Sequence, residues 1–533
     1  MGNGFASGVS SASGAGSPSE QPPARVGSTR TDARSCAKQR ALPLIVWISL
    51  AGATAGLVAY SQTFAYSGDE GFHLLAAQLV MNGKRLYLDF FYQHPPMFVL
   101  LNVPWMRVFG DTWRSAHLLS ALFTAACVVL TARFILASVA LGKRGAEVAI
   151  CAVLLLAGGR LVFHAGTIGQ PYAFSLFFLT ASFVLTVRVT RQSSGGRAFW
   201  AGAAAGAAAC SYLLAAACVL ILFAWLVVRN QAGSRARKAI QFVAGAMIPF
   251  APLLPALVRA PRVVLFDLIE YHLWYRGCEG HLRSWFLALT SWGETVLLLA
   301  LAALGLWFVT QSPWKREEKE GYYLAACLVA GHLLYMLMVH NVFELYFVLM
   351  MPFVVLLASV GMPTLFTNPR LQHAGMAAVA CALALMAARQ IMVKKLPRQS
   401  WKELEVIARQ VDEAAPRDGW LYAYEELYFL TRRVPPPGLE NIQGLDIDAA
   451  RAKPLHLVSQ AEVAQWIKDG RFSAVLVGVE GPTSLDLKTQ YKRFRTMQVT
   501  PGEPGCLLWN DTVGQPTMIP KTSIAGGSPA TPR

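Results

Sequence analysis

The sequence predicts an α-helical polytopic membrane protein that ends in a small α/β domain outside the membrane. Of its 533 residues, 54% are hydrophobic and only 15% are charged, and the mean hydropathy is +0.41. Soluble globular proteins of this size are less apolar and more highly charged. Long apolar runs recur until about Ile391, after which the composition changes. These observations place a membrane domain before a water-soluble one.

Apolar runs long enough to cross a bilayer give the expected helices, because a span of hydrocarbon needs about 20 residues. The candidates are Leu42 to Tyr60, Ala116 to Ala137, Val148 to Gly159, Pro171 to Val187, Ile240 to Val258, Trp285 to Val309, Tyr322 to Val339, Leu345 to Val360 and Leu371 to Ala388. The run from Ala198 to Val228 is long for one span. We expect two short helices that turn near Tyr212, which brings the total to about 11 spans.

The distribution of charge sets the expected topology. The net charge of +16 comes from short basic clusters between the apolar runs, as the positive-inside rule requires of cytoplasmic loops. We therefore attribute the charge to topology and expect no nucleic-acid partner. The prediction is a multi-pass protein of a bacterial inner membrane, with a cytoplasmic amino terminus and the carboxyl-terminal domain outside.

Four regions follow from this topology. Residues 1–40 are expected to be a disordered cytoplasmic tail, 41–391 the membrane domain, 392–510 an extracytoplasmic α/β domain and 511–533 a disordered tail. Within 392–510, Trp401 to Val411 has helical periodicity, and Trp420 to Tyr424, Phe472 to Gly478 and Gly505 to Trp509 resemble strands.

The first outer loop, residues 62–115, carries the strongest candidate site. Asp69 and Glu70 follow a stretch of 28 residues without a charge, and an acid at a membrane interface is by default a functional hypothesis. We expect an amphipathic interfacial helix from Glu70 to Met81 with Asp69 at its N-cap. Glu70 and His73 then share its polar face, where they could hold each other, a cation or a substrate. The competing interpretation is that Asp69 only caps the helix.

The rest of this loop is polar and aromatic, and a short apolar helix follows it. Met97 to Phe109 is too short to span a bilayer, so we expect it to lie along the interface. The polar stretch before it comprises Lys84, Arg85, Tyr87, Asp89, Tyr92, Gln93 and His94.

These motifs resemble those of the polytopic GT-C glycosyltransferases, and most of all the branch of protein O-mannosyltransferases and aminoarabinose-transferase-like enzymes. The resemblance rests on Ser67-Gly-Asp-Glu-Gly-Phe-His73, on Leu86-Tyr-Leu-Asp-Phe-Phe-Tyr-Gln-His-Pro-Pro96 and on Val108-Phe-Gly-Asp-Thr-Trp113. It extends more loosely to Gly169-Gln-Pro-Tyr172, to Glu344-Leu-Tyr-Phe347 and to the terminal domain.

The resemblance implies transfer of a sugar from a polyprenyl-phosphate carrier to an acceptor hydroxyl on the outer face, with inversion. It implies that Asp69 is the general base and that Glu70 orients the acceptor or a bound cation. Cationic groups must stabilise the leaving phosphate, and Lys84, Arg85 and His94 are the preferred candidates. The further candidates are Arg160, Arg259, Arg262, His272 and Arg276.

Other polar residues are expected to bind substrate. Tyr92, Gln93, Gln170 and Glu344 join His73 in this set, whereas Glu294 is more simply explained as a buried, paired acid. The loop from Phe163 to Gln170 differs from relatives that carry an acid or arginine there, so it identifies no second carboxylate. A divalent cation could bind Asp69, Glu70 and His73, although we expect no obligatory metal.

Two other hypotheses compete with catalysis. A transporter or flippase of lipid-linked sugars would usually show internal repeats and broken helices at mid-membrane, and the sequence shows no repeat. A catalytically silent scaffold is the third hypothesis, against which the Asp69-Glu70 pair and its basic neighbours argue.

Overall fold

Helices dominate the computed structural model, which describes residues 43–509 apart from 192–195, 230–233, 275–280, 292, 340–341, 363–399, 416, 418, 442–446, 479–486, 488–490 and 501–502. The chain divides into two units, Met1–Pro43 and Leu44–Arg533, and the described helices and strands lie in the second. The expected tails, residues 1–40 and 511–533, and the expected span from Leu371 to Ala388 lie outside the described residues.

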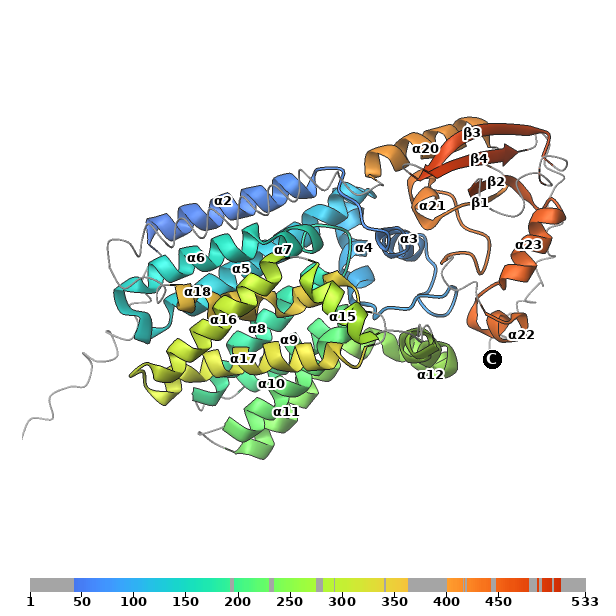
Figure 1. Ribbon diagram of the computed structural model, residues 1–533. Helices are drawn as coiled ribbons and strands as arrows, with labels where there is room; N and C mark the ends of the chain where they lie inside the picture. Colours follow the sequence, from blue (N-terminus) through green and yellow to red (C-terminus); the bar gives the residue numbers. More distant parts are fainter. Residues whose placement is uncertain are drawn as a thin grey trace, which may run out of the picture. The chain divides into compact units, whose positions relative to one another are not determined.

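The first half of the membrane region begins with α2 (Leu44–Ser61), which packs against α5 and α6 (Figure 1). The first outer loop contributes two helices that match the expected bounds, α3 (Glu70–Met81) and α4 (Met97–Phe109). The helices that follow are α5 (Trp113–Leu136), η1 (Val139–Arg144), α6 (Gly145–Gly158), α7 (Arg160–Ala165), α8 (Tyr172–Arg191), α9 (Arg197–Ser211), η2 (Leu213–Ala215) and α10 (Ala216–Arg229).

The second half contains shorter and more irregular helices. These are α11 (Arg235–Met247), η3 (Ile248–Leu253), α12 (Leu254–Arg259), α13 (Pro261–Leu265), η4 (Phe266–Glu270), α14 (Tyr271–Trp274), α15 (His281–Thr290), α16 (Gly293–Gln311), α17 (Arg316–Met336), η5 (Glu344–Met350) and α18 (Met351–Gly361). Prolines at 249 and 252 fall in η3, where their missing N–H groups favour a tighter turn over a regular α-helix.

Two expectations about the spans can now be judged. The run from Ala198 to Val228 is indeed two helices, α9 and α10, separated at Tyr212. The expected single helix from Trp285 to Val309 is wrong, because the chain breaks at Ser291 between α15 and α16. The Ser291 hydroxyl donates to the Ala288 carbonyl there, which competes with the helical backbone bonds.

Six helices of the described chain are long and apolar enough to cross a membrane. They are Leu44–Ser61, Trp113–Leu136, Tyr172–Arg191, Arg235–Arg259, Gly293–Gln311 and Glu344–Gly361. Shorter apolar helices accompany them, including α6 and α4. Close helix contacts use glycine: a Cβ on Gly202 or Gly206 of α9 would collide with the backbone of α11.

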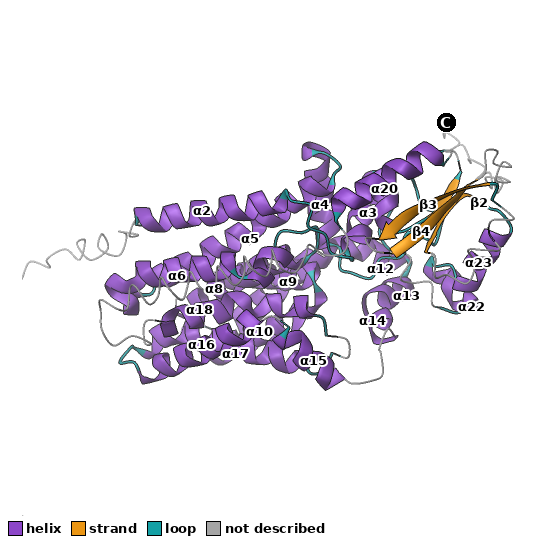
Figure 2. Cartoon of the chain, turned by 45° about the horizontal axis from the view of Figure 1, so that its top comes forward, coloured by secondary structure: helices purple, strands orange, loops and turns teal. Residues whose placement is uncertain are grey.

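Residues 400–509 combine helices with strands, of which Figure 2 labels β2, β3 and β4. The sheet has four strands in the order β1-β2-β4-β3. β1 (Trp420–Tyr422) is parallel to β2 (Phe472–Gly478), which is antiparallel to β4 (Glu503–Trp509), and β3 (Arg493–Thr500) is an edge strand antiparallel to β4. The helices here are α20 (Trp401–Ala414), α21 (Glu425–Thr431), α22 (Ala449–Ala452), η8 (Lys453–Leu455) and α23 (Gln460–Lys468). Capping boxes start α20 at Ser400 and α23 at Ser459.

A hydrophobic core joins the first outer loop to this carboxyl-terminal segment. Phe72 and Leu75 of α3 share one buried cluster with Trp401 of α20 and Tyr428 of α21. Helix α3 is consequently buried at every residue from Glu70 to Leu79. The expected amphipathic helix with a wet polar face is therefore wrong, because α4 and α21 pack against it. Its polar side chains must find partners inside the protein.

Candidate active site at the start of α3

The two adjacent acids lie in opposite environments. Asp69 is exposed and occupies the N-cap position of α3, yet its side chain makes no cap hydrogen bond. Its carboxylate interacts electrostatically with the Tyr172 hydroxyl at the start of α8. Glu70, the first residue of the helix, is fully buried. The explanation of Asp69 as a side-chain cap is thus not supported by its geometry.

Glu70 connects four segments of the chain through its two oxygens. Oε1 accepts from the Ser67 amide at 2.9 Å. Oε2 accepts from the Gly169 amide at 3.2 Å and from the Trp401 indole at 3.2 Å. The same oxygen lies 2.6 Å from His117 Nε2. Protein donors thus occupy both oxygens, and the carboxylate fixes the turn that carries Asp69.

His117 of α5 is the buried side-chain partner of Glu70. Its Nε2 faces the carboxyl group, and its Nδ1 lies 3.1 Å from the Ser61 carbonyl oxygen. Both ring nitrogens therefore have an oxygen partner, which fixes the orientation of the imidazole. Sequence reasoning missed His117, which stands 47 positions after Glu70 and follows no local motif.

The expected pairing of Glu70 with His73 is wrong. His73 Nδ1 lies 2.9 Å from the Tyr92 hydroxyl, and its ring packs against His94 and Phe98. Burial lowers the pKa of His73 to about 3, so the ring is neutral. Spacing of three residues puts both side chains near one face, but the tertiary partners of α3 direct them into separate networks.

His94 lies in an aromatic stack and not in a cationic site. Its ring is stacked between Phe72 and Tyr212, with centroid distances of 5.5 and 5.7 Å. Burial is the main reason why the pKa of His94 lies well below its usual value, and the neighbouring His73 and His272 lower it further. These surroundings do not favour the expectation that His94 stabilises a phosphate as a cation, because burial favours the neutral ring. Tyr212 also packs edge-to-face against Tyr172, with 5.0 Å between the ring centroids.

Gln93 and Tyr92 face protein groups on the other side of this stack. The Asn441 amide donates to Gln93 Oε1, and His272 Nε2 donates to the Gln93 carbonyl oxygen at 2.7 Å. The Tyr92 amide lies 3.3 Å from Oδ2 of Asp267, whose burial raises its pKa well above the ordinary value. His272 is thus joined to the expected site through Gln93.

The two basic residues of the loop differ in their surroundings. The guanidinium of exposed Arg85 contacts Asp89 at 2.6 and 3.1 Å and is committed to that ion pair. Lys84 is half-buried, and it interacts electrostatically with Glu440 of the carboxyl-terminal segment. The Lys84 amide donates to the Leu79 carbonyl, so this lysine lies at the end of α3 opposite to Asp69.

Gln170, which lies between α7 and α8, contacts the turn that carries Asp69. Its Nε2 donates to Ser67 Oγ at 3.2 Å, and its buried Oε1 has no hydrogen-bond partner among the described residues. A buried, unpartnered carbonyl oxygen next to the exposed acid is suited to accept a hydrogen bond from a substrate hydroxyl.

The acids of the later spans meet Arg160 at the start of α7. Glu294 Oε1 accepts from the Leu161 amide at 3.2 Å, so this carboxylate binds the helix amino terminus, in line with the paired, structural interpretation. Half-buried Glu344 and Glu294 both interact electrostatically with Arg160.

The remaining cationic candidates have diverse positions. Arg259 ends α12, Arg262 lies in α13, and both are exposed. Arg276 is outside the described residues. Across the part of the chain that the structure describes, no three His, Cys, Asp or Glu side chains are arranged to hold a metal ion.

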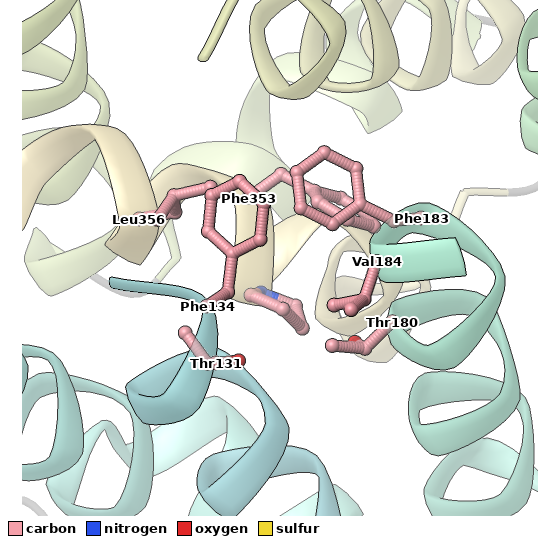
Figure 3. A pocket seen from close by; sticks show the side chains of 8 residues that line it. Thr131, Phe134, Thr180, Phe183, Val184, Phe353 and Leu356 are labelled. Atoms are coloured by element: carbon pink, nitrogen blue, oxygen red, sulfur yellow. The ribbon is translucent and has the colours of Figure 1, made fainter. Parts of the chain in front are cut away.

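A small cavity inside the bundle is unsuited to a substrate. Thr131 and Phe134 of α5, Thr180, Phe183 and Val184 of α8, and Phe353 and Leu356 of α18 surround it (Figure 3). Its volume of about 10 Å³ accommodates a single water molecule. Neither a sugar nor a prenyl unit fits, so the site at the start of α3 remains the candidate.

With this geometry, the chain can be compared with known proteins. The sequence family described as dolichyl-phosphate-mannose-protein mannosyltransferase matches residues 93–258. No curated protein matches the sequence.

Solved structures show the fold more completely. The structure is similar to ArnT from Cupriavidus metallidurans bound to undecaprenyl phosphate, with a TM-score of 0.65, 16% identity, and coverage of 88% of this chain and 98% of that one. ArnT in the apo state gives a TM-score of 0.65 at 15% identity, and the match covers 87% of this chain and 97% of that one. The oligosaccharyltransferase of Archaeoglobus fulgidus in the apo form gives a TM-score of 0.51 at 10% identity, and the match covers 82% of this chain and 70% of that one.

Both similar proteins have the GT-C architecture of membrane glycosyltransferases. This chain therefore has a GT-C fold, and together with its six candidate spans the match identifies it as a multi-pass membrane protein.

Proposed function

We propose that this protein is a membrane glycosyltransferase that moves a sugar from a polyprenyl-phosphate donor to an acceptor hydroxyl on the outer face. The fold similarity to ArnT bound to undecaprenyl phosphate and the partial match to dolichyl-phosphate-mannose-dependent enzymes support the donor class. The observation that carries the proposal is the exposed carboxylate of Asp69 beside the buried, fully hydrogen-bonded Glu70.

In this reaction Asp69 acts as the general base. The acceptor oxygen attacks the anomeric carbon and its proton passes to the Asp69 carboxylate. The bond between that carbon and the phosphate oxygen breaks, and polyprenyl phosphate leaves with the bonding electrons. Attack opposite the leaving group inverts the anomeric centre. Glu70 holds the turn and makes no contact with the reacting atoms.

Gln170 is the residue beside this turn that can bind a substrate. Its Oε1 accepts a hydrogen bond from a sugar or acceptor hydroxyl, which would satisfy its missing contact. Lys84 lies beyond the opposite end of α3 from Asp69, a helix of 12 residues that is about 18 Å long, so we assign it no contact with the leaving phosphate. Arg160 interacts electrostatically with Glu294 and Glu344, so we assign it no role in binding either.

The decisive variant is Asp69→Asn, which keeps the size of the side chain and removes the base. Purified protein in liposomes would receive a labelled polyprenyl-phosphate sugar and an extract of envelope acceptors. We expect transfer to fall at least a hundredfold with donor binding retained. Asp469→Asn, an exposed acid in the carboxyl-terminal segment, is the matched control. Wild-type transfer by Asp69→Asn would refute the assignment, and movement of donor across the bilayer without transfer would identify a flippase.

A further inference from the structure

The Tyr66 hydroxyl lies between two acceptors and has only one hydrogen to give. It is 3.2 Å from the Gly68 carbonyl oxygen, at the residue directly before Asp69. It also forms a short contact with the Glu426 carboxyl oxygen Oε1. A phenol donates one hydrogen bond, so both contacts are satisfied only if the second hydrogen comes from Glu426. A protonated Glu426, whose O–H donates to the Tyr66 oxygen while Tyr66 donates to Gly68, fits this arrangement.

The surroundings of Glu426 favour the protonated form. The side chain enters from α21 and lies directly over Gly71 of α3, where an added Cβ would be 2.5 Å from its Cδ. The ionisable groups acting on it are Glu425 of its own helix, Glu70 of α3 and Tyr66 of the loop. Burial first, and then the charge of Glu425, raise the pKa of Glu426 to about 8.

We propose that Glu426 is a positioning residue that the carboxyl-terminal segment contributes to the catalytic turn. Its protonated carboxyl donates to Tyr66, and Tyr66 donates to the Gly68 carbonyl, which fixes the backbone that presents Asp69. This inference rests on the proposed function, in which Asp69 is the base. Glu426 itself touches no substrate.

Ionisation of Glu426 reverses this arrangement. A carboxylate accepts hydrogen bonds more strongly than a carbonyl, so the single Tyr66 hydrogen turns to Glu426. The Gly68 carbonyl then loses its partner and the turn at Asp69 relaxes. Because a hydrogen bond contributes about a factor of five to ten, kcat should fall by about that factor as the pH rises through 8, with little change in KM.

The test uses the full-length protein in liposomes and measures kcat and KM between pH 6.5 and 9.5. Glu426→Gln keeps a donor for Tyr66 at every pH, so we expect neutral kcat to be retained and the fall near pH 8 to disappear. Tyr66→Phe should lower kcat about five- to tenfold at neutral pH without changing KM. Glu425→Gln removes a repelling charge and should move the fall to lower pH. An unchanged fall in Glu426→Gln, or wild-type kcat in Tyr66→Phe, would overturn the inference.

A readout that does not depend on catalysis separates this inference from the proposed function. Amide hydrogen exchange of residues 64–72, corrected for the intrinsic effect of pH, should accelerate in Tyr66→Phe and in the wild type above pH 8. Exchange in α23 serves as the internal control. Full activity in Asp69→Asn would refute the function but leave these exchange rates intact, whereas an inactive Asp69→Asn combined with unchanged exchange would refute only the role of Glu426.

Discussion

Trp401 donates its indole hydrogen to Glu70 across 331 positions of sequence, at a distance of 3.2 Å. Its backbone amide also donates to the Phe64 carbonyl at 3.1 Å, so the first residue of α20 contacts both ends of the turn. The carboxyl-terminal segment is therefore part of the support for Asp69.

Trp401→Phe should weaken this support without removing the aromatic packing. The ring of Trp401 is stacked on Trp113 at 5.5 Å, and a phenyl ring can keep that contact while it loses the N–H donor. We expect a loss of roughly 1–2 kcal/mol in stability, as for hydrogen bonds to charged acceptors, and lower kcat. Thermal unfolding in detergent and the transfer assay would measure both. Trp420→Phe, which changes an indole packed on Trp466, is the control, and an equal loss of kcat in that variant would contradict the specific role of Trp401.

The buried pair of Glu70 and His117 should be strongly coupled. Removing one partner leaves an uncompensated buried charge, which typically costs 3–5 kcal/mol, so His117→Gln and Glu70→Gln should each be poorly stable. The double variant carries neither charge and should be less destabilised than the sum of the two. Chemical unfolding of the four proteins in detergent gives the coupling energy. Simple additivity would show that the two side chains do not stabilise each other.

Gly71 and Gly68 offer a matched pair of substitutions in the same turn. A Cβ on Gly71 would lie 2.5 Å from Cδ and 2.6 Å from Oε1 of Glu426, whereas a Cβ on Gly68 meets nothing within 4 Å. Gly71→Ala should therefore displace Glu426 and lower both stability and transfer, with a cost of about 1–3 kcal/mol. Gly68→Ala should be close to wild type in its melting temperature. Similar melting temperatures for the two variants would show that α21 adjusts at little cost.

Local signals predicted the helices of the site well, but not the partners of its side chains. The bounds of α3 and α4 follow from Asn82-Gly83 and Pro95-Pro96, which end and start helices within a few residues. His117 and Trp401 reach Glu70 only through the tertiary fold, so neither helical periodicity nor a motif could identify them.

The sheet also shows where prediction from local sequence fails. Strands β2 and β4 are apolar and were expected from sequence, whereas β3 was missed. It is an edge strand whose sequence, Arg-Phe-Arg-Thr-Met-Gln-Val-Thr, includes two arginines. Charged side chains are common on edges because they discourage pairing with another chain, and they weaken the apolar signal of a strand.

The buried carboxyl group of Glu440 should make the stability of the carboxyl-terminal segment depend on pH. Burial raises its pKa to about 7, and its Oε2 accepts from the Gly438 amide at 2.7 Å. The folded state holds the proton up to about pH 7, whereas the unfolded chain releases it near 4.5. The contribution of the protonated carboxyl to the free energy of unfolding is thus fully present below pH 4.5. It declines as the pH rises to 7 and does not change further above pH 7.

Glu440→Gln should remove this dependence while keeping the acceptor for Gly438. Relative to the wild type it should gain stability on going from pH 4.5 to 7.5, by at most ~3 kcal/mol at about 1.4 kcal/mol for each pKa unit. Hydrogen exchange of residues 420–440 at the two pH values would measure the difference. Lys84→Ala should have the opposite effect to Glu440→Gln. The lysine charge lowers the pKa of Glu440, so its loss should enlarge the fall in stability between pH 4.5 and 7.5. A parallel pH dependence in wild type and Glu440→Gln would show that this carboxyl is ionised at neutral pH in the folded protein.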